Sequence, residues 1–89
     1  MWLDLMANAM FFYTYILMCA DGKLYIGSTT DLRRRLSEHE AAEVSATAHR
    51  LPVRLVYYEA CRSENAARLR EKQLKTGYGR QYLKERLAE

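Results

Sequence analysis

Apolar residues occur along the chain in three runs of strand length, separated by polar segments with helical spacing. Residues 11–18 (FFYTYILM) are continuously aromatic and aliphatic, which predicts a central strand covered on both faces. Residues 23–28 (KLYIGS) follow a short turn and predict the second strand of a β-hairpin. Residues 53–60 (VRLVYYEA) predict a third strand.

The length of the hairpin loop decides which side chains share a face of the sheet. A two-residue loop would turn Tyr15 away from Tyr25. A three-residue loop over 20–22 places Gly22 last, where a type I turn with a G1 bulge requires a positive φ. We favour this loop, which sets Tyr15 opposite Gly27 and Leu17 opposite Tyr25. Both tyrosines then project from one face as diagonal neighbours.

The first helix is predicted over residues 32–43 (LRRRLSEHEAAE), after several N-cap candidates at 28–31. At 100° per residue, Leu32 and Leu36 form its buried edge. Arg35 and His39 are four residues apart and therefore lie side by side on the flank of the helix. Residues 44–51 predict a loop.

The last third of the chain predicts two more helices. Ser63 caps a helix over 64–75, which Gly77 ends as the glycine that follows the C-cap. A short final helix from about Gly79 places Leu83 and Leu87 inward. The order of three strands and three helices predicts an α+β domain in which helices pack on a small mixed sheet. Residues 1–10 are interpreted as an N-terminal extension and residues 11–89 as one domain.

Composition narrows the class of protein. Apolar residues make up 49% and charged residues 28% of the 89 residues, which is typical of a soluble globular domain. The apolar runs are too short to span a membrane, and the first residues do not resemble a secretion signal, so we expect a cytoplasmic protein without a membrane partner. Cys19 and Cys61 provide neither a disulfide framework nor a zinc site.

Charge is distributed unevenly along the chain. The net charge is +3, but residues 62–89 alone carry eight basic and four acidic side chains. This excess permits a polyanionic partner without requiring one. The residues predicted to contact nucleic-acid phosphates are Arg33, Arg34, Arg50, Lys72, Lys75 and Arg80.

Four motifs together resemble the GIY-YIG nuclease domain, and in particular its small stand-alone bacterial members, related to the nuclease domain of the excinuclease C subunit. They are YTYIL at 13–17, YIGST at 25–29, DLRRR at 31–35 with His39 four residues after Arg35, and REKQLKTGYGR at 70–80. The resemblance covers residues 11–87. Tyr13 and Thr14 stand where the first motif usually has glycine and isoleucine.

The resemblance implies a fold and a set of catalytic residues. The fold is a three-stranded antiparallel sheet flanked by helices, and the reaction is phosphodiester hydrolysis assisted by one divalent ion, Mg²⁺ or Mn²⁺. The implied catalytic residues are Tyr15, Tyr25, Arg35, His39 and Glu71, with Glu71 also the metal ligand and Gly27 a structural residue of the site.

The residue types suit that chemistry. A glutamate holds a hard cation, and an arginine suits phosphate oxygens. A tyrosine, with a pKa of about 10, acts as a base only where a nearby metal or arginine lowers that pKa. Tyr15 is the first choice for the base, and Tyr25 and His39 share the remaining hydrogen-bonding roles. We expect the hydroxyls of Tyr15 and Tyr25 to open onto one groove with Arg35 and Glu71.

Each of these residues also has an ordinary structural explanation. The tyrosines could be core residues, His39 a surface histidine, and Glu71 half of an i,i+4 pair with Lys75. The leading hypothesis is a metal-dependent nuclease acting on DNA, structure-specific or engaged in repair or recombination. The alternative is a non-catalytic nucleic-acid-binding or adaptor module of the same fold. RNA as substrate, and a protein partner that supplies targeting, both stay open.

Overall fold

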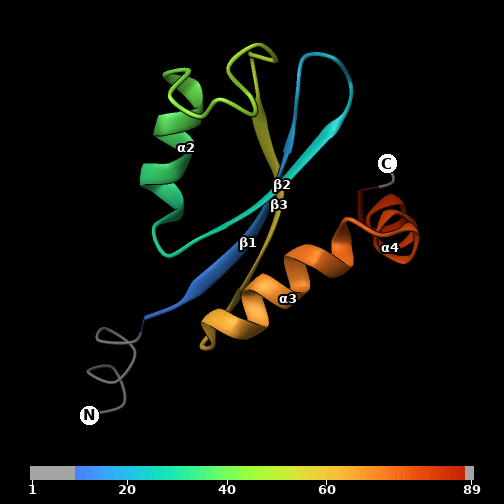
Figure 1. Cartoon of the computed structure of the whole chain (residues 1–89). Coiled ribbons are helices and arrows are strands. Elements are labelled where there is room, and N and C mark those ends of the chain that lie inside the picture. Colours follow the sequence, from blue (N-terminus) through green and yellow to red (C-terminus); the bar gives the residue numbers. More distant parts are fainter. Residues whose placement is uncertain (1–9, 88–89) are drawn as a thin grey trace.

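The computed structural model describes residues 10–87, so most of the predicted N-terminal extension lies outside the described residues. Strands β1 (Phe12–Met18), β2 (Leu24–Thr29) and β3 (Arg54–Cys61) form one antiparallel sheet in the order β2-β1-β3 (Figure 1). The predicted α+β class, the three antiparallel strands and the central place of β1 are confirmed, whereas the mixed sheet expected from the order of elements is wrong, because both strand pairs are antiparallel. Within residues 10–87, no helix is long and apolar enough to cross a membrane.

The β1–β2 hairpin has the predicted turn and register. Gly22 has a φ of +79°, and its N–H donates to the Cys19 carbonyl at 3.0 Å. The Cys19 N–H donates to the Lys23 carbonyl at 3.0 Å, which closes the turn. Tyr15 therefore pairs with Gly27, as the three-residue loop requires.

Helix α2 (Leu32–Glu40) begins where predicted and ends earlier. The Asp31 carboxylate accepts a hydrogen bond from the Arg34 N–H at 3.1 Å and caps the helix. The prediction that it runs to residue 43 is wrong, because Ala42 has a φ of +63° and the Glu43 N–H donates back to the Glu38 carbonyl at 2.9 Å. This is a Schellman turn built on alanine, a residue that usually favours helix.

Helices α3 (Glu64–Leu74) and α4 (Gly77–Leu87) follow β3. Ser63 caps α3 as predicted, accepting from the Ala66 N–H at 3.1 Å. Gly77 does not end α3 in a left-handed conformation. It begins α4, and the hydroxyl of Thr76 accepts from the Gly79 N–H at 3.2 Å.

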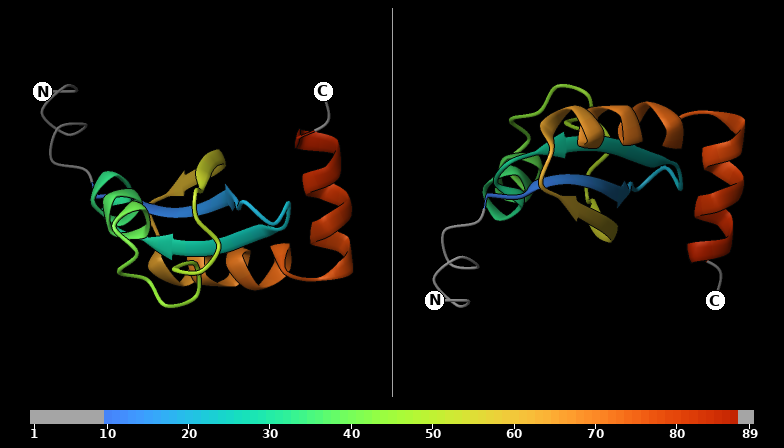
Figure 2. Two further views of the ribbon diagram at one scale, coloured as in Figure 1. Left: turned by 90° about the horizontal axis from the view of Figure 1, so that it is seen from above. Right: turned by 90° about the horizontal axis from the view of Figure 1, so that it is seen from below.

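Gly79 allows α3 and α4 to approach closely. A Cβ added to Gly79 would lie 2.3 Å from the Leu74 Cα, so only glycine fits between the two helices. Helix α3 runs along one face of the sheet, and α4 turns away from α3 and crosses the end of the sheet (Figure 2). Ile16 of β1 packs there with Leu74 and Leu83, which form the apolar core.

The two faces of the sheet are covered differently. Helix α2 lies on the opposite side of the sheet from α3 (Figure 1). Thr14 and Ile16 face α3, where the Thr14 hydroxyl donates to the Ala67 carbonyl at 3.0 Å. Tyr15 and Leu17 alternate with them and face α2 and the loop that follows it. We call these the α3 face and the α2 face.

Candidate active site

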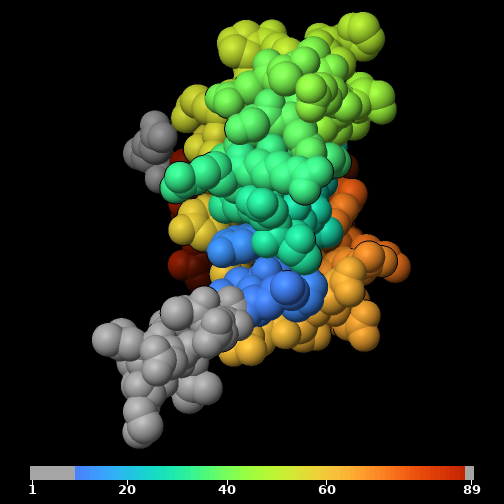
Figure 3. Space-filling view, turned by 90° about the vertical axis from the view of Figure 1, so that its left-hand side faces the viewer, coloured from blue at the N-terminus to red at the C-terminus, as the bar shows by residue number. Residues whose placement is uncertain are grey.

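Tyr15 lies at the centre of the α2 face, against the backbone of Gly27. A Cβ on residue 27 would be 2.7 Å from the Tyr15 hydroxyl oxygen, so a larger residue would displace the tyrosine ring. The Tyr15 side chain is completely buried. The expectation that its hydroxyl opens onto a groove is therefore wrong, because α2 and the loop after it lie over this face of the sheet (Figure 3).

Tyr25 and His39 pack around Tyr15. The ring centroid of Tyr25 is 6.3 Å from that of Tyr15 and 5.2 Å from that of His39, which confirms that both tyrosines share one face. The prediction that Leu32 and Leu36 form the buried edge of α2 is wrong. Both are only partly buried, whereas His39 is fully buried, because the last turn of α2 is the part that packs on Tyr15 and Tyr25.

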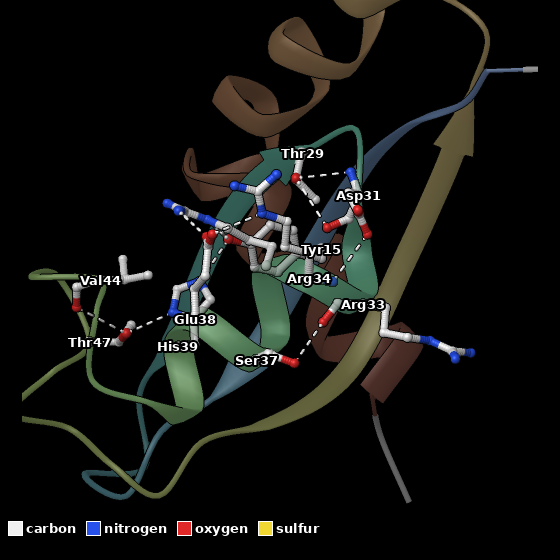
Figure 4. Close-up of polar contacts among 11 residues, drawn as sticks. Tyr15, Thr29, Asp31, Arg33, Arg34, Ser37, Glu38, His39, Val44 and Thr47 are labelled. Carbon is white, nitrogen blue, oxygen red and sulfur yellow. Dashed lines mark hydrogen bonds and ion pairs between the residues drawn. The ribbon is translucent and has the colours of Figure 1, made fainter.

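A chain of hydrogen bonds joins the strand to the loop after α2. The Tyr15 hydroxyl is 2.7 Å from His39 Nε2, and His39 Nδ1 is 2.7 Å from the Thr47 hydroxyl. The Thr47 hydroxyl donates to the Val44 carbonyl at 3.5 Å. Figure 4 shows Thr47 between Val44 and the imidazole ring, on the side away from Tyr15.

Arg35 lies between solvent and the buried chain of hydrogen bonds that begins at the Tyr15 hydroxyl. Its Nε donates to the Tyr15 hydroxyl at 3.4 Å and its Nη1 to the Glu38 carboxylate at 3.0 Å. The hydrogen bonds to Tyr15 and Glu38 raise the pKa of Arg35 above its ordinary value, so the guanidinium stays charged. Its side chain is 36% exposed, and it is therefore the member of the cluster that an incoming anion would meet first.

Tyr15 and His39, the buried hydrogen-bonded pair, are both neutral. Burial raises the pKa of Tyr15, and the opposing hydrogen bond from Arg35 is too weak to reverse that. Burial and the charge of Arg35 lower the pKa of His39, with Glu38 acting weakly in the other direction. Neither group is charged near neutral pH, so a proton leaving Tyr15 needs a neutral acceptor close by.

Glu71 lies on α3 and approaches the site from the other face of the sheet. Burial raises the pKa of its carboxyl group, but the hydrogen bonds from Lys75 and from the Ser28 hydroxyl outweigh this and lower it. The Lys75 ammonium is 2.8 Å from the carboxylate, so the i,i+4 pair is present. The Glu71 charge nevertheless raises the pKa of Tyr15, which shows electrostatic coupling between the two groups.

An open cleft of about 430 Å³ is lined by neighbours of Tyr15 and of Glu71, although neither of these two residues is in its wall. Arg35, which contacts Tyr15, and Ser28, which lowers the pKa of Glu71, are both in its wall. Arg34 and Arg68 add two further positive charges to the lining, each paired with a glutamate. The cleft therefore adjoins Arg35 and Glu38 on the α2 face and Ser28, the hydrogen-bond partner of Glu71.

The predicted phosphate-binding residues are dispersed. Arg33 and Arg34 are exposed on α2, and Arg33 points away from Tyr15 in Figure 4. Arg50 pairs with Asp21 at the hairpin turn at 2.9 Å. Lys72 and Arg80 are exposed on α3 and α4.

Sequence reasoning missed two members of the cluster, Thr47 and Glu38. Glu38 follows Arg34 by four residues and Arg35 by three, and this helical spacing was a signal for the ion pairs that form. Thr47 lies in a weakly patterned loop between Ser45 and His49. Nothing local distinguishes it, because its burial depends on how the loop folds back over the sheet.

Comparison with known proteins identifies the family to which the chain belongs. The model of the GIY-YIG catalytic domain matches residues 11–85. A UPF0213 protein of Desulfotalea psychrophila is 46% identical over 65 residues, which are 71% of this chain and 59% of that relative. A UPF0213 protein of Streptococcus pyogenes is 52% identical over 56 residues, 62% of this chain and 61% of that relative. The matched part thus spans about six tenths of the length of these two relatives.

A solved structure shows the same fold. The solution NMR structure of a UPF0213 protein from Bacillus halodurans has a TM-score of 0.53 and 36% sequence identity to this chain. The alignment covers 83% of this chain and 82% of that one. The family match covers residues 11–85 of the chain, which therefore belongs to the GIY-YIG catalytic domain family, a family of nucleases that generally depend on a divalent metal ion.

Proposed function

We propose that this chain is a metal-dependent nuclease that hydrolyses phosphodiester bonds in DNA. The observation that carries the proposal is the juxtaposition of Tyr15, His39 and Arg35 beside a cleft whose wall also includes Ser28, the neighbour of Glu71. A tyrosine hydroxyl, a neutral imidazole and a permanent cation are the groups that water activation and phosphate binding require.

In this mechanism Arg35 binds a phosphate oxygen of the scissile group. When the guanidinium turns toward that oxygen, its Nε leaves the Tyr15 hydroxyl, and the attacking water takes its place there. Tyr15 takes a proton from the water and passes its own proton to His39 Nε2, 2.7 Å away. Tyr15 then releases the water-derived proton to solvent as the imidazolium returns its proton to the tyrosine, and the departing oxygen takes up a proton from solvent water. Tyr25 packs against both rings and orients them.

Glu71 is the group that would hold the metal ion. Its lowered pKa keeps the carboxylate charged, and its side chain is 23% exposed, so solvent reaches part of it. Among residues 10–87, no cluster of three or more acidic, histidine or cysteine side chains could hold an ion. A single carboxylate suits Mg²⁺ or Mn²⁺, which keep several waters and bind substrate phosphate. When bound, such an ion polarises the phosphoryl group and stabilises the departing oxygen.

The dispersed basic residues suit recognition of the phosphate backbone rather than of bases. Arg33, Lys72 and Arg80 are exposed on three different helices. Contacts to phosphate through such side chains fix position without reading sequence, and they weaken as salt concentration rises. We therefore expect a nuclease whose selectivity follows DNA structure, as repair or recombination requires.

Substitution of Glu71 by glutamine tests the proposal. Purified protein is incubated with plasmid, single-stranded and branched DNA in Mg²⁺, Mn²⁺ or EDTA. Glu71→Gln keeps the shape of the side chain and removes the charge that holds the ion, so cleavage should be abolished. DNA binding in EDTA should stay equal or become slightly stronger, since a negative charge facing phosphate is gone. The matched control is Glu85→Gln, an exposed glutamate of α4, which should cleave like the wild type.

Substitution of Arg35 by alanine separates the enzyme from the binding module. Arg35→Ala should lower cleavage far more than binding, because the guanidinium acts on charge that develops in the transition state. A non-catalytic module gives no metal-dependent products from the wild type, and its losses of binding follow total positive charge. Cleavage by Glu71→Gln equal to that by the wild type would falsify the catalytic assignment and indicate a contaminating nuclease.

A further inference from the structure

The loop after α2 carries a buried threonine whose hydroxyl contacts the site histidine. Thr47 and His39 are both completely buried, and the Thr47 hydroxyl lies 2.7 Å from Nδ1, the imidazole nitrogen that faces away from Tyr15. Among the described residues, no buried side-chain nitrogen or oxygen lacks a hydrogen-bond partner. Each hydrogen in this chain therefore has a definite place.

The Arg35 end of the chain fixes its direction. Arg35 Nε can only donate, and the Tyr15 oxygen accepts from it at 3.4 Å. The Tyr15 hydrogen then goes to His39 Nε2, 2.7 Å away. A neutral ring that accepts at Nε2 carries its proton on Nδ1, and the Thr47 oxygen accepts that hydrogen. The Thr47 hydrogen then points to the Val44 carbonyl at 3.5 Å, a weak contact because two backbone N–H groups also donate to that oxygen.

The other neutral tautomer of His39, with its proton on Nε2, does not satisfy the same hydrogen-bonding atoms. If His39 carried its proton on Nε2, the Tyr15 oxygen would accept from both Arg35 and His39. Its own hydrogen would have no acceptor among the described residues, since these two are the partners of that hydroxyl. A doubly protonated ring is disfavoured as well, because burial and Arg35 lower the pKa of His39.

The loop is built to hold Thr47 in this position. The Thr47 and Ala48 N–H groups both donate to the Val44 carbonyl, at 3.0 and 2.9 Å, and Val44 is itself buried. The Glu43 N–H donates to the carbonyl of Glu38, one residue before His39 in α2. The turn that ends α2 thus ties the loop to the helix that carries the imidazole.

We propose that Thr47 is a positioning residue that holds His39 as the tautomer with its proton on Nδ1, which leaves Nε2 unprotonated to receive the proton of Tyr15. The catalytic consequence rests on the proposed nuclease function, whereas the tautomer is a property of the protein by itself. Loss of the threonine hydroxyl leaves the Nδ1–H without an acceptor. The Nδ1-protonated ring then has an unsatisfied N–H, so part of the population moves its proton to Nε2 at the cost of the acceptor for Tyr15, and that part cannot take a proton from Tyr15.

Nitrogen-15 NMR of the imidazole rings tests the tautomer directly. In the wild type at neutral pH, His39 Nδ1 should show the shift of a protonated nitrogen and Nε2 that of an unprotonated one. Valine has nearly the shape of threonine but lacks the hydroxyl, so Thr47→Val should increase the population of the His39 tautomer that is protonated on Nε2. Thr47→Ser restores a hydroxyl and should restore the wild-type spectrum. The exposed His49 provides an internal reference that should not change.

Kinetics on DNA then test the catalytic role. Thr47→Val should lower kcat by about 10- to 100-fold with little change in KM, since Thr47 is completely buried and does not line the cleft. Thr47→Ser should recover most of the rate, and Ser45→Ala, an exposed hydroxyl of the same loop, should match the wild type.

Two results would overturn the proposal. The first is a wild-type His39 protonated on Nε2, which can be read even if Thr47→Val does not fold. The second is an unchanged kcat in a folded Thr47→Val protein, or a loss that Thr47→Ser does not recover. Failure of the nuclease function gives a different pattern, in which the wild type shows the Nδ1-protonated ring but no cleavage of any DNA. That pattern overturns the catalytic role of Thr47 together with the proposed function and leaves the tautomer assignment intact.

Discussion

The two faces of the sheet are both buried, but by different kinds of side chain. On the α3 face, the apolar side chains of Ile16, Leu74 and Leu83 form the core. On the α2 face, Tyr15 and His39 are equally buried, and hydrogen bonds join them. Apolar contacts are non-directional, whereas a chain of hydrogen bonds requires each atom to stay within a few tenths of an ångström.

This difference separates stability from chemistry. Burial of apolar surface on the α3 face contributes about 25 cal/mol for each Å² removed from water. A hydrogen bond on the α2 face contributes only about 1 kcal/mol net, but a partner left unsatisfied costs about 1–3 kcal/mol. The α3 face therefore holds the fold together, and the α2 face fixes the orientation of Tyr15 and His39.

Leu74→Ala should give the largest loss of stability. It removes a completely buried side chain from the apolar core, and the free energy of unfolding should fall by about 2–5 kcal/mol. Urea denaturation measures the change. Leu69 is on the same helix and 57% exposed, so Leu69→Ala should stay within about 0.5 kcal/mol of the wild type. Equal losses from both variants would mean that the α3 face is not the stabilising one.

Tyr15→Phe should show the reverse pattern, with activity affected more than stability. The ring keeps its packing, but His39 Nε2 loses its partner, and unfolding should become about 1–3 kcal/mol easier. DNA cleavage should fall by at least about 100-fold, because the proton path begins at the lost hydroxyl. Tyr78, which is 72% exposed on α4, supplies the matched control Tyr78→Phe. Retained cleavage by a folded Tyr15→Phe protein would exclude Tyr15 as the base.

The hydrogen bonds of Glu59 on the α3 face should make stability depend on pH, and they should have no effect on DNA cleavage. Burial raises the pKa of Glu59, but hydrogen bonds from Arg70, at 2.9 Å, and from Tyr57, at 2.7 Å, outweigh this and lower it. Since the pKa is lower in the folded protein, the contacts stabilise the fold above the ordinary glutamate value of 4.5. This stabilisation is lost as the pH falls through the lowered value.

Glu59→Gln should therefore reduce the free energy of unfolding at pH 7 by about 1–2 kcal/mol and have progressively less effect as the pH falls below the ordinary glutamate value. Urea denaturation at pH 7 and at a pH below 4.5 measures the difference. Cleavage of DNA by the folded variant should equal that of the wild type, because Glu59 lies on the face opposite Tyr15. A loss that is the same at both pH values would show that the charge of Glu59 is not the cause.

Features of the fold that depend on short-range sequence could be predicted. The apolar run of β1 indicated a central strand, and Gly22 indicated the turn that places Tyr15 against Gly27. Both arguments use residues within about ten positions of each other. The family motifs then identified Arg35 and His39, which the structure brings to Tyr15.

Features that depend on packing between elements could not be predicted. Gly77 resembles a glycine that ends a helix, but the Thr76 hydroxyl takes the Gly79 N–H and starts α4 there instead. Thr47 is one of many small polar residues in its loop, and only the fold of the chain over the α2 face brings it to His39. Helix α2 was expected to continue to residue 43, since no residue there opposes helix by its own preference.

Of these substitutions, Ala42→Gly should give the smallest effect, a gain in the stability of the protein that comes from the turn after α2. Ala42 has a φ of +63°, a conformation that glycine adopts without the steric cost that a Cβ imposes. The greater freedom of glycine in the unfolded chain offsets part of that gain. The free energy of unfolding should therefore rise by about 0.5–1 kcal/mol, as urea denaturation would measure.

Ala41 provides the matched control for this prediction, because it is adjacent and has an ordinary φ of −84°. Ala41→Gly releases no strain and should lower the free energy of unfolding by about 0.5–1 kcal/mol. The turn at Ala42 also ties the loop of Thr47 to α2, so a gain in stability from Ala42→Gly should leave the His39 tautomer unchanged. Destabilisation by both substitutions would mean that the left-handed turn is not strained at Ala42, and that contacts of its methyl group hold the loop on the α2 face.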